Sequence, residues 1–172
     1  MHENAQMWSQ IMQAFAESPS QERVVRFLLE NGLGVSPEGR VVCNRIAIPA
    51  TQVAAAVGVD RRVVDATAKR ILDDNRLAPI FSRMRATPDL SIVAEHLGLS
   101  VITITPKDAR DRGIVASAVR VLDQHDLAIR QIFVTDPYLA EEPKLVVIVD
   151  GTLPHGVVDE LRSLPQVRRI TL

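Results

Sequence analysis

The sequence of 172 residues predicts an α+β protein built in two parts. Residues 100–172 switch between short β-branched runs and helical apolar stripes, in the order strand, helix, strand, strand, helix, strand. Residues 1–86 show helical periodicity interrupted by one extended run. Thr87, Pro88 and Asp89 break the chain between the two parts, and residues 87–99 are expected to form a linker with a short helix ending at Gly98.

The elements of the second part follow from apolar spacing. Residues 100–105 are β-branched and stop at Pro106, as is typical of a strand. Ile114, Ala118 and Leu122 recur four residues apart, which predicts a helix over 113–125. The remaining elements are, in order, strands over 128–135 and 144–150, a helix over 154–164, and a strand over 167–172.

This βαββαβ order corresponds to two crossover units that share one antiparallel sheet, the ferredoxin-like arrangement. Right-handed crossovers place both helices on one face of the sheet. The other face and the sheet edges then need a cover, because bare edges invite strand pairing. A unit of this size also buries a limited core. We therefore expect pairing with a second copy.

The second part resembles the ACT domain, a small ligand-sensing module. The resemblance spans residues 100–172 and is carried by Asp111-Arg112-Gly113-Ile114-Val115 and by Leu127-Ala128-Ile129. It implies side-by-side dimers and an amino acid or similar effector bound near the loop between the first strand and the first helix. Arg110 and Arg112 replace the usual acidic residue or Asn and the usual Pro of that loop. The expected effector-binding residues are Asp108, Asp111, Gly113, Ile114, Val115 and Ile129.

Two interpretations of this loop remain open. Free backbone N–H groups at the start of the helix after Gly113 favour an anion such as a carboxylate, and Asp108 or Asp111 would accept an amine. Alternatively, both acids only stabilise the helix dipole at its amino end.

The first part contains a candidate helix-turn-helix. Helices are expected over 7–16 and 21–31, followed by a turn over 36–39 and an extended run over 40–48. Pro49 starts a short helix that Gly58 ends, and Asp60 is a suitable N-cap for a helix over 61–75. A short helix, a tight turn and a longer helix form the helix-turn-helix pattern. Together with the extended run and the chain after Leu77, it predicts a winged helix-turn-helix-like domain.

The second helix of this motif has a basic outward face. Val64, Ala68 and Ile71 face inward, whereas Arg62, Ala66, Lys69 and Asp73 face outward. Residues 40–86 carry nine Lys and Arg against four Asp and Glu, in a chain whose net charge is −1. A basic face at the start of such a helix favours contact with double-stranded DNA. The expected DNA-binding residues are Thr51, Arg61, Arg62, Ala66, Lys69, Arg70, Arg83 and Arg85.

Alternatives accompany this interpretation. If the helix over 61–75 does not bind DNA, it is a solvated amphipathic helix of a winged domain that makes protein contacts. Residues 76–86, which contain Arg83 and Arg85, form either a wing that touches phosphates or a hairpin remnant that leads into the linker.

Composition and motifs argue against catalysis, cofactors and membranes. The single Cys43 excludes an internal disulfide and fits a reducing compartment. No apolar run approaches the ~18 residues of a membrane span, and the polar start lacks the features of a secretory signal, so we expect a cytoplasmic protein. Neither metal-ligand spacing nor a phosphate-binding Gly loop nor a nucleophile elbow occurs. We therefore expect no enzyme, no metal and no cofactor. The four scattered histidines are His2, His96, His125 and His155.

The whole chain resembles a group of archaeal regulators of amino-acid metabolism that combine a helix-turn-helix with an ACT domain. Phrases such as Ile48-Pro49-Ala50-Thr51-Gln52 and Pro143-Lys144-Leu145 carry this resemblance. It implies a homodimeric, ligand-responsive transcriptional regulator. Two other classes remain: an allosteric partner of a biosynthetic enzyme that does not bind DNA, and an unrecognised enzyme.

Overall fold

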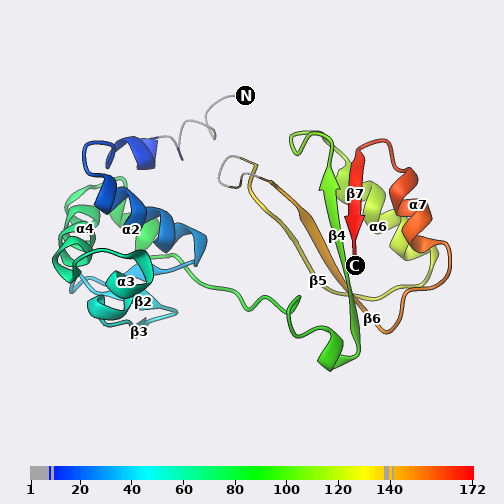
Figure 1. Cartoon of the computed structure of the whole chain (residues 1–172), viewed down its shortest axis with the longest axis horizontal. Coiled ribbons are helices and arrows are strands. Elements are labelled where there is room, and N and C mark those ends of the chain that lie inside the picture. The colour runs from blue at the N-terminus through cyan, green and yellow to red at the C-terminus, as the bar shows by residue number, and fades with distance from the viewer. Residues whose placement is uncertain (1–7, 9, 138–139, 141) are drawn as a thin grey trace. The chain divides into compact units, whose positions relative to one another are not determined.

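The computed structural model describes residues 8, 10–137, 140 and 142–172 (Figure 1). The chain divides into two compact units, Met1–Pro88 and Asp89–Leu172. Helices combine with two antiparallel sheets, one in each unit, so the predicted α+β class is confirmed. Most of the expected linker 87–99 belongs to the second unit.

The first unit begins with helical segments. Residues 10–13 are helical within the helix expected over 7–16, of which Met7 and Ser9 lie outside the described residues. Helix α2 (Pro19–Glu30) follows, with Pro19 at its start, where a missing backbone N–H costs nothing. Val24 and Leu28, one turn apart on α2, are fully buried in the core of this unit.

A small antiparallel sheet comes next, and the single extended run expected over 40–48 is wrong. Strands β1 (Gly34–Val35), β2 (Val41–Cys43) and β3 (Ile46–Ala47) pair in that order. The run is a hairpin because Asn44 and Arg45 adopt positive φ angles of 48° and 81° and reverse the chain. The Asn44 amide fastens this turn, since it donates to the Ala86 carbonyl at 2.9 Å and accepts from the Ala86 N–H at 3.0 Å.

Helices α3 (Ala50–Val57) and α4 (Arg61–Asp73) lie where the sequence predicts them. Gly58 ends α3 with a φ of 71°, a conformation that glycine adopts without strain. The Asp60 carboxylate caps α4 by accepting from the Arg62 N–H at 2.8 Å. The predicted inward side of α4 is confirmed, because Val64, Ala68 and Ile71 are buried.

Residues 76–86 form no wing or hairpin, so both structural interpretations of this segment are wrong. Instead the short helix α5 (Ala78–Phe81) inserts Phe81 completely into the core. The fit is tight beside β1, where a Cβ added to Gly34 would lie 2.5 Å from the Phe81 carbonyl oxygen. In the described part of this unit, strands β1, β2 and β3 all precede α3 in the chain. No described strand of this unit therefore follows α4, where a wing was expected.

The second unit has the predicted strand and helix order. Its elements are β4 (Leu99–Pro106), α6 (Ile114–Gln124), β5 (Ile129–Val134), β6 (Leu145–Asp150), α7 (Val157–Ser163) and β7 (Val167–Thr171). The strands lie in the order β5-β6-β4-β7, and all neighbours are antiparallel. Helices α6 and α7 contact each other and cover one face, where Ile102 and Val147 are fully buried (Figure 1).

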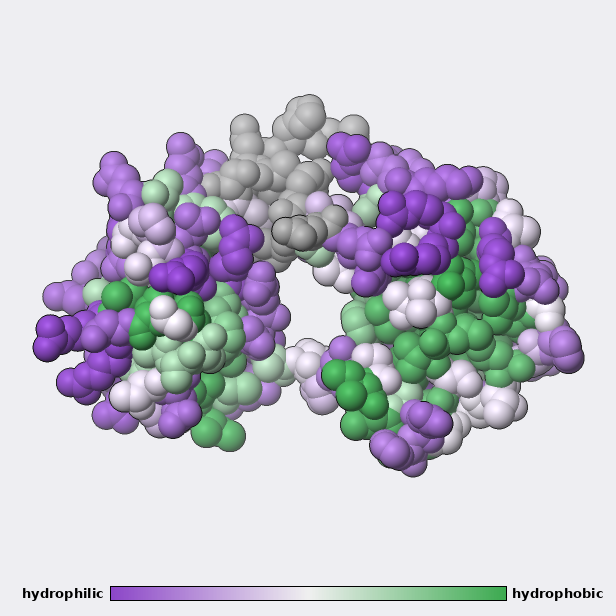
Figure 2. Space-filling view, viewed as in Figure 1, coloured by the Kyte–Doolittle hydropathy of each residue, from purple (hydrophilic) through white to green (hydrophobic). Residues whose placement is uncertain are grey.

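The segment before β4 covers part of the opposite face. The helix expected over 90–97 is only a series of turns and the 3-10 helix η1 (Glu95–Leu97), which ends at Gly98. Ala94 is buried here against Val146 and Ile148 of β6. Apolar side chains remain visible on this unit in Figure 2, and Ile92 is 88% exposed.

Candidate nucleic-acid and effector sites

The exposed side of α4 presents three cations. Arg61 and Arg62 occupy the first turn, directly after the Asp60 cap, and Lys69 lies two turns further on. Within the described part of the chain, none of the three is engaged in an ion pair. Their positive charges are therefore available to an external anion.

Two smaller residues of the predicted DNA-binding set lie on helices α3 and α4 themselves. Ala66 is exposed between Arg62 and Lys69 on α4, and its small side chain leaves room for close approach. Thr51 is exposed in the first turn of α3. Asp65 and Asp73 are also exposed on α4, so the helix carries both signs of charge.

Arg70 behaves differently from the other predicted DNA-binding residues. Its guanidinium lies 4.9 Å from the centre of the Phe15 ring, a cation–π geometry. It also donates to the Gln21 side chain at 2.9 Å and to the Ala14 carbonyl at 2.6 Å. The structure therefore gives Arg70 a role in holding α4 to the preceding segments, and we leave it out of the candidate surface.

Arg83 and Arg85 belong to a separate basic group. Both are exposed, and Arg85 donates to the Met84 carbonyl at 2.6 Å. The hydrogen bonds between Asn44 and Ala86 bring the hairpin turn next to this segment. Arg45, exposed in that turn, thus joins the group, although sequence reasoning missed it. The available signal was Asn44, a residue that tolerates positive φ between two β-branched runs.

In the second unit, Asp108 is held by Arg110. Its carboxylate accepts from the Arg110 backbone N–H at 2.9 Å and from the guanidinium at 3.0 and 2.9 Å. These side-chain hydrogen bonds, followed by the backbone one, lower the pKa of Asp108 below its usual value. The Asp108 carboxylate was expected to bind the amine of an effector. Arg110 neutralises part of its negative charge.

A shallow cavity of about 400 Å³ lies beside this pair. Lys107, Asp108 and Arg110 line it together with Pro137 and Pro143. The Lys107 ammonium donates to the Pro165 carbonyl at 2.8 Å, which ties this loop to the segment before β7. Of the predicted effector residues, only Asp108 lines this cavity.

The other predicted effector residues are placed around the start of α6. Gly113 precedes the helix with a φ of 87°, and no side chain of the described residues caps this helix start. Asp111 and Val115 are exposed near the same end. Ile114 is buried and Ile129 packs against the same core, so the structure gives both side chains a packing role.

The described residues include no group of His, Cys, Asp and Glu that is suited to hold a metal ion. Among these residues, too, no helix is both long and apolar enough to cross a membrane. His125 interacts with Glu160 at 3.0 Å, which connects the end of α6 to α7. We interpret this pair as an inter-helix contact rather than a catalytic one.

Comparisons with known proteins give no family for this chain. No protein family model matches it, and no curated protein matches it.

Proposed function

We propose that the protein is a ligand-responsive transcriptional regulator that binds DNA through a helix-turn-helix in its first unit. The observation that carries this proposal is the α3–α4 pair: a glycine turn, an Asp60-capped helix, and the exposed cations Arg61, Arg62 and Lys69, none of which is in an ion pair with another described residue. A capped helix that presents cations in this way suits the major groove, where Arg and Lys contact guanine edges and phosphates.

The second unit is proposed to be an ACT-like sensor with a ferredoxin-like fold. Its strand order and its helices on one face support this proposal. Exposed apolar side chains support pairing with a second copy, because isolated domains rarely expose such groups together. They include Ile132 and Val134 on the edge strand β5, at 38% and 52% exposure.

The two units would act together in a homodimer. Paired sensor units hold two copies of α4 apart at a set distance, and two-fold symmetry then requires DNA half-sites about one helical turn apart. An amino acid or similar effector near Asp108, Asp111 and Val115 would favour the dimer geometry to which it binds more tightly. DNA affinity changes by the same coupling free energy.

The test is selection of bound genomic DNA by the full chain, with and without a pool of amino acids. We expect enrichment of sites with two related halves, and a change in enrichment when the pool is added. The variant Arg62→Ala with Lys69→Ala should recover no enriched sites.

A matched control removes two exposed cations elsewhere, at Arg23 on α2 and Arg120 on α6. It should select the same sites as the wild type. Absence of any enrichment by the wild-type protein would favour the alternative of an allosteric protein partner that does not bind DNA.

A further inference from the structure

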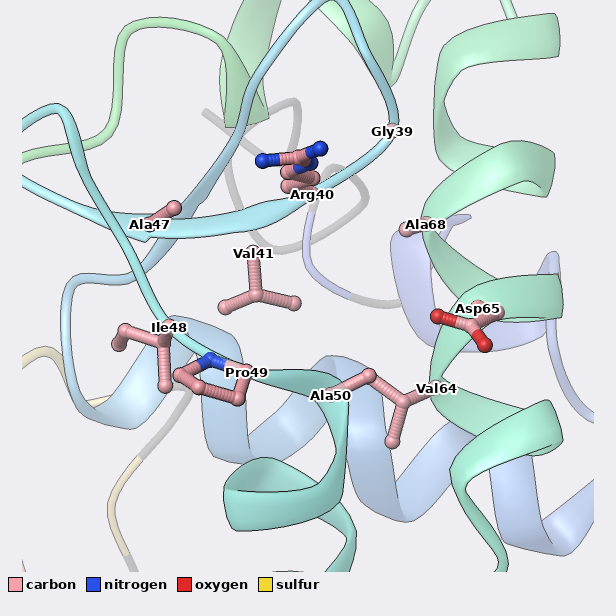
Figure 3. A pocket seen from close by; sticks show the side chains of 10 residues that line it. All are labelled: Gly39, Arg40, Val41, Ala47, Ile48, Pro49, Ala50, Val64, Asp65 and Ala68. Atoms are coloured by element: carbon pink, nitrogen blue, oxygen red, sulfur yellow. The ribbon is translucent and has the colours of Figure 1, made fainter.

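The first unit contains a cavity that the sites above do not use. Its volume is about 310 Å³, and it lies between the β2–β3 hairpin and helices α3 and α4 (Figure 3). Ligand pockets in proteins span about 300 to 1,000 Å³. This cavity therefore suits a molecule at the small end of that range.

The floor of the cavity is aliphatic. Val41 on β2 and Val64 on α4 are buried beneath it, at 3% and 1% exposure. Ile48 and Ala50 line the side where the hairpin leads into α3, and both are half-buried. Figure 3 shows Val41 between the hairpin strand and α4. Such a floor stabilises a branched aliphatic group by removing it from water.

Opposite charges stand on the two sides of this floor. Arg40 lies directly before β2, and Asp65 lies on α4 (Figure 3). Both residues are exposed, and the described ion pairs include neither of them. The acid closest in sequence to Arg40, Glu38, has a lowered pKa chiefly because its carboxylate is hydrogen-bonded to Ser36, and the charge of Arg40 lowers this pKa to a smaller extent. A ligand in the cavity would thus meet a guanidinium on one side, which it would share with the charge of Glu38, and a carboxylate on the other.

We propose that this cavity binds a small aliphatic α-amino acid in its zwitterionic form. The ligand carboxylate pairs with Arg40, its ammonium pairs with Asp65, and its side chain covers Val41 and Val64. An aliphatic acid alone would leave Asp65 without a cation, and an amine alone would leave Arg40 without an anion. Charge-assisted hydrogen bonds on both sides make the zwitterion the best match.

Such a ligand would bridge two structural elements, because Arg40 belongs to the hairpin segment and Asp65 to α4. Binding favours the arrangement of hairpin and helix that the ligand fits. The binding itself does not depend on the DNA role of α4. Only an effect of the ligand on DNA affinity would rest on the function proposed above.

The test is a titration of the full-length, methyl-labelled protein with L-valine and L-leucine by NMR. We expect the largest shifts at Val41, Ile48 and Val64. Isoamylamine and isocaproate, which each lack one charged group of leucine, should bind about tenfold more weakly. Shifts confined to the second unit, for example at Ile104 and Val147, would overturn this inference and leave the proposed sensor intact. No shift with millimolar ligand would also overturn it.

Two substitutions locate the charges. Arg40→Gln and Asp65→Asn should each weaken leucine binding about tenfold. Arg45→Gln and Asp73→Asn are matched controls, since both residues are exposed in the same hairpin or helix but do not line the cavity. Equal affinity in all four variants would contradict the assignment of this cavity.

Discussion

The Asp60 carboxylate accepts a hydrogen bond from the Arg62 backbone N–H at 2.8 Å. This bond satisfies one of the N–H groups that a helix start leaves without a partner. It also fixes the first turn of α4, which carries Arg61 and Arg62 on its exposed side. The cap therefore connects the stability of the first unit to the position of the candidate DNA-binding cations.

Loss of this cap should destabilise the first unit. We expect Asp60→Ala to lower the free energy of unfolding by about 1 kcal/mol, the usual cost of removing an N-cap. Urea denaturation of the full chain measures this change. The control Asp73→Ala, at the other end of α4, should stay within about 0.5 kcal/mol of the wild type. An equal effect of both substitutions would contradict the role of Asp60.

Arg70 and its neighbour Lys69 should separate stability from DNA binding. Arg70→Met removes the cation–π contact with Phe15 and the hydrogen bonds to Gln21 and Ala14, so unfolding should become easier by about 1 kcal/mol. Its DNA affinity should be unchanged under native conditions. Lys69→Met should leave the free energy of unfolding unchanged and weaken DNA affinity. A weaker DNA affinity in Arg70→Met than in Lys69→Met would return Arg70 to the DNA surface.

Phe81 tests the corrected structure of residues 76–86. Its side chain is completely buried, so Phe81→Ala should cost about 3–5 kcal/mol of unfolding free energy. If Phe81 lay on an exposed wing, its replacement by Ala would change the free energy of unfolding little. Ile46→Ala is the matched apolar control in the same unit, because Ile46 is 73% exposed. Thermal unfolding that is alike for the two variants would be inconsistent with a buried Phe81.

Much of the fold was predictable because apolar spacing is a local property. The stripe Val64, Ala68 and Ile71 predicted the buried side of α4, and the structure confirms it. The hairpin was missed because apolar residues stand on both sides of Asn44 and Arg45, so the run looks continuous. Both residues adopt positive φ angles. In the sequence, only Asn44 indicated such a conformation, because Asn tolerates positive φ.

The candidate sites were less predictable because they depend on side-chain partners. Arg70 and Lys69 are adjacent cations in the sequence, yet only Arg70 reaches the Phe15 ring. Likewise, the hold of Arg110 on Asp108 depends on a loop conformation that residue spacing does not encode. The cavity between Arg40 and Asp65 joins segments far apart in the chain, so no local pattern indicated it.

Glu142 should make the second unit sensitive to acid. Its hydrogen bond with Lys144, and to a lesser extent the charges of Arg169 and Arg168, hold the pKa of Glu142 below its usual value. A lowered folded-state pKa contributes stability above the unfolded-state value, and this contribution disappears as the pH falls through the folded-state pKa.

The comparison that isolates this effect is Glu142→Gln against the wild type, by urea denaturation near neutral pH and at acid pH. The variant should be less stable at neutral pH, and the difference should vanish in acid. A difference that stays constant across this pH range would contradict the ion-pair explanation.

We propose that the exposed side of α4 binds DNA through Arg62 and Lys69. Fluorescence anisotropy of one genomic DNA fragment across a series of salt concentrations tests it most directly. The wild type should lose affinity steeply with salt, and Arg62→Ala with Lys69→Ala should lower the slope of log affinity against log salt by about 2, or about 1 per lost contact. A slope in the double variant equal to that of the wild type would contradict the claim.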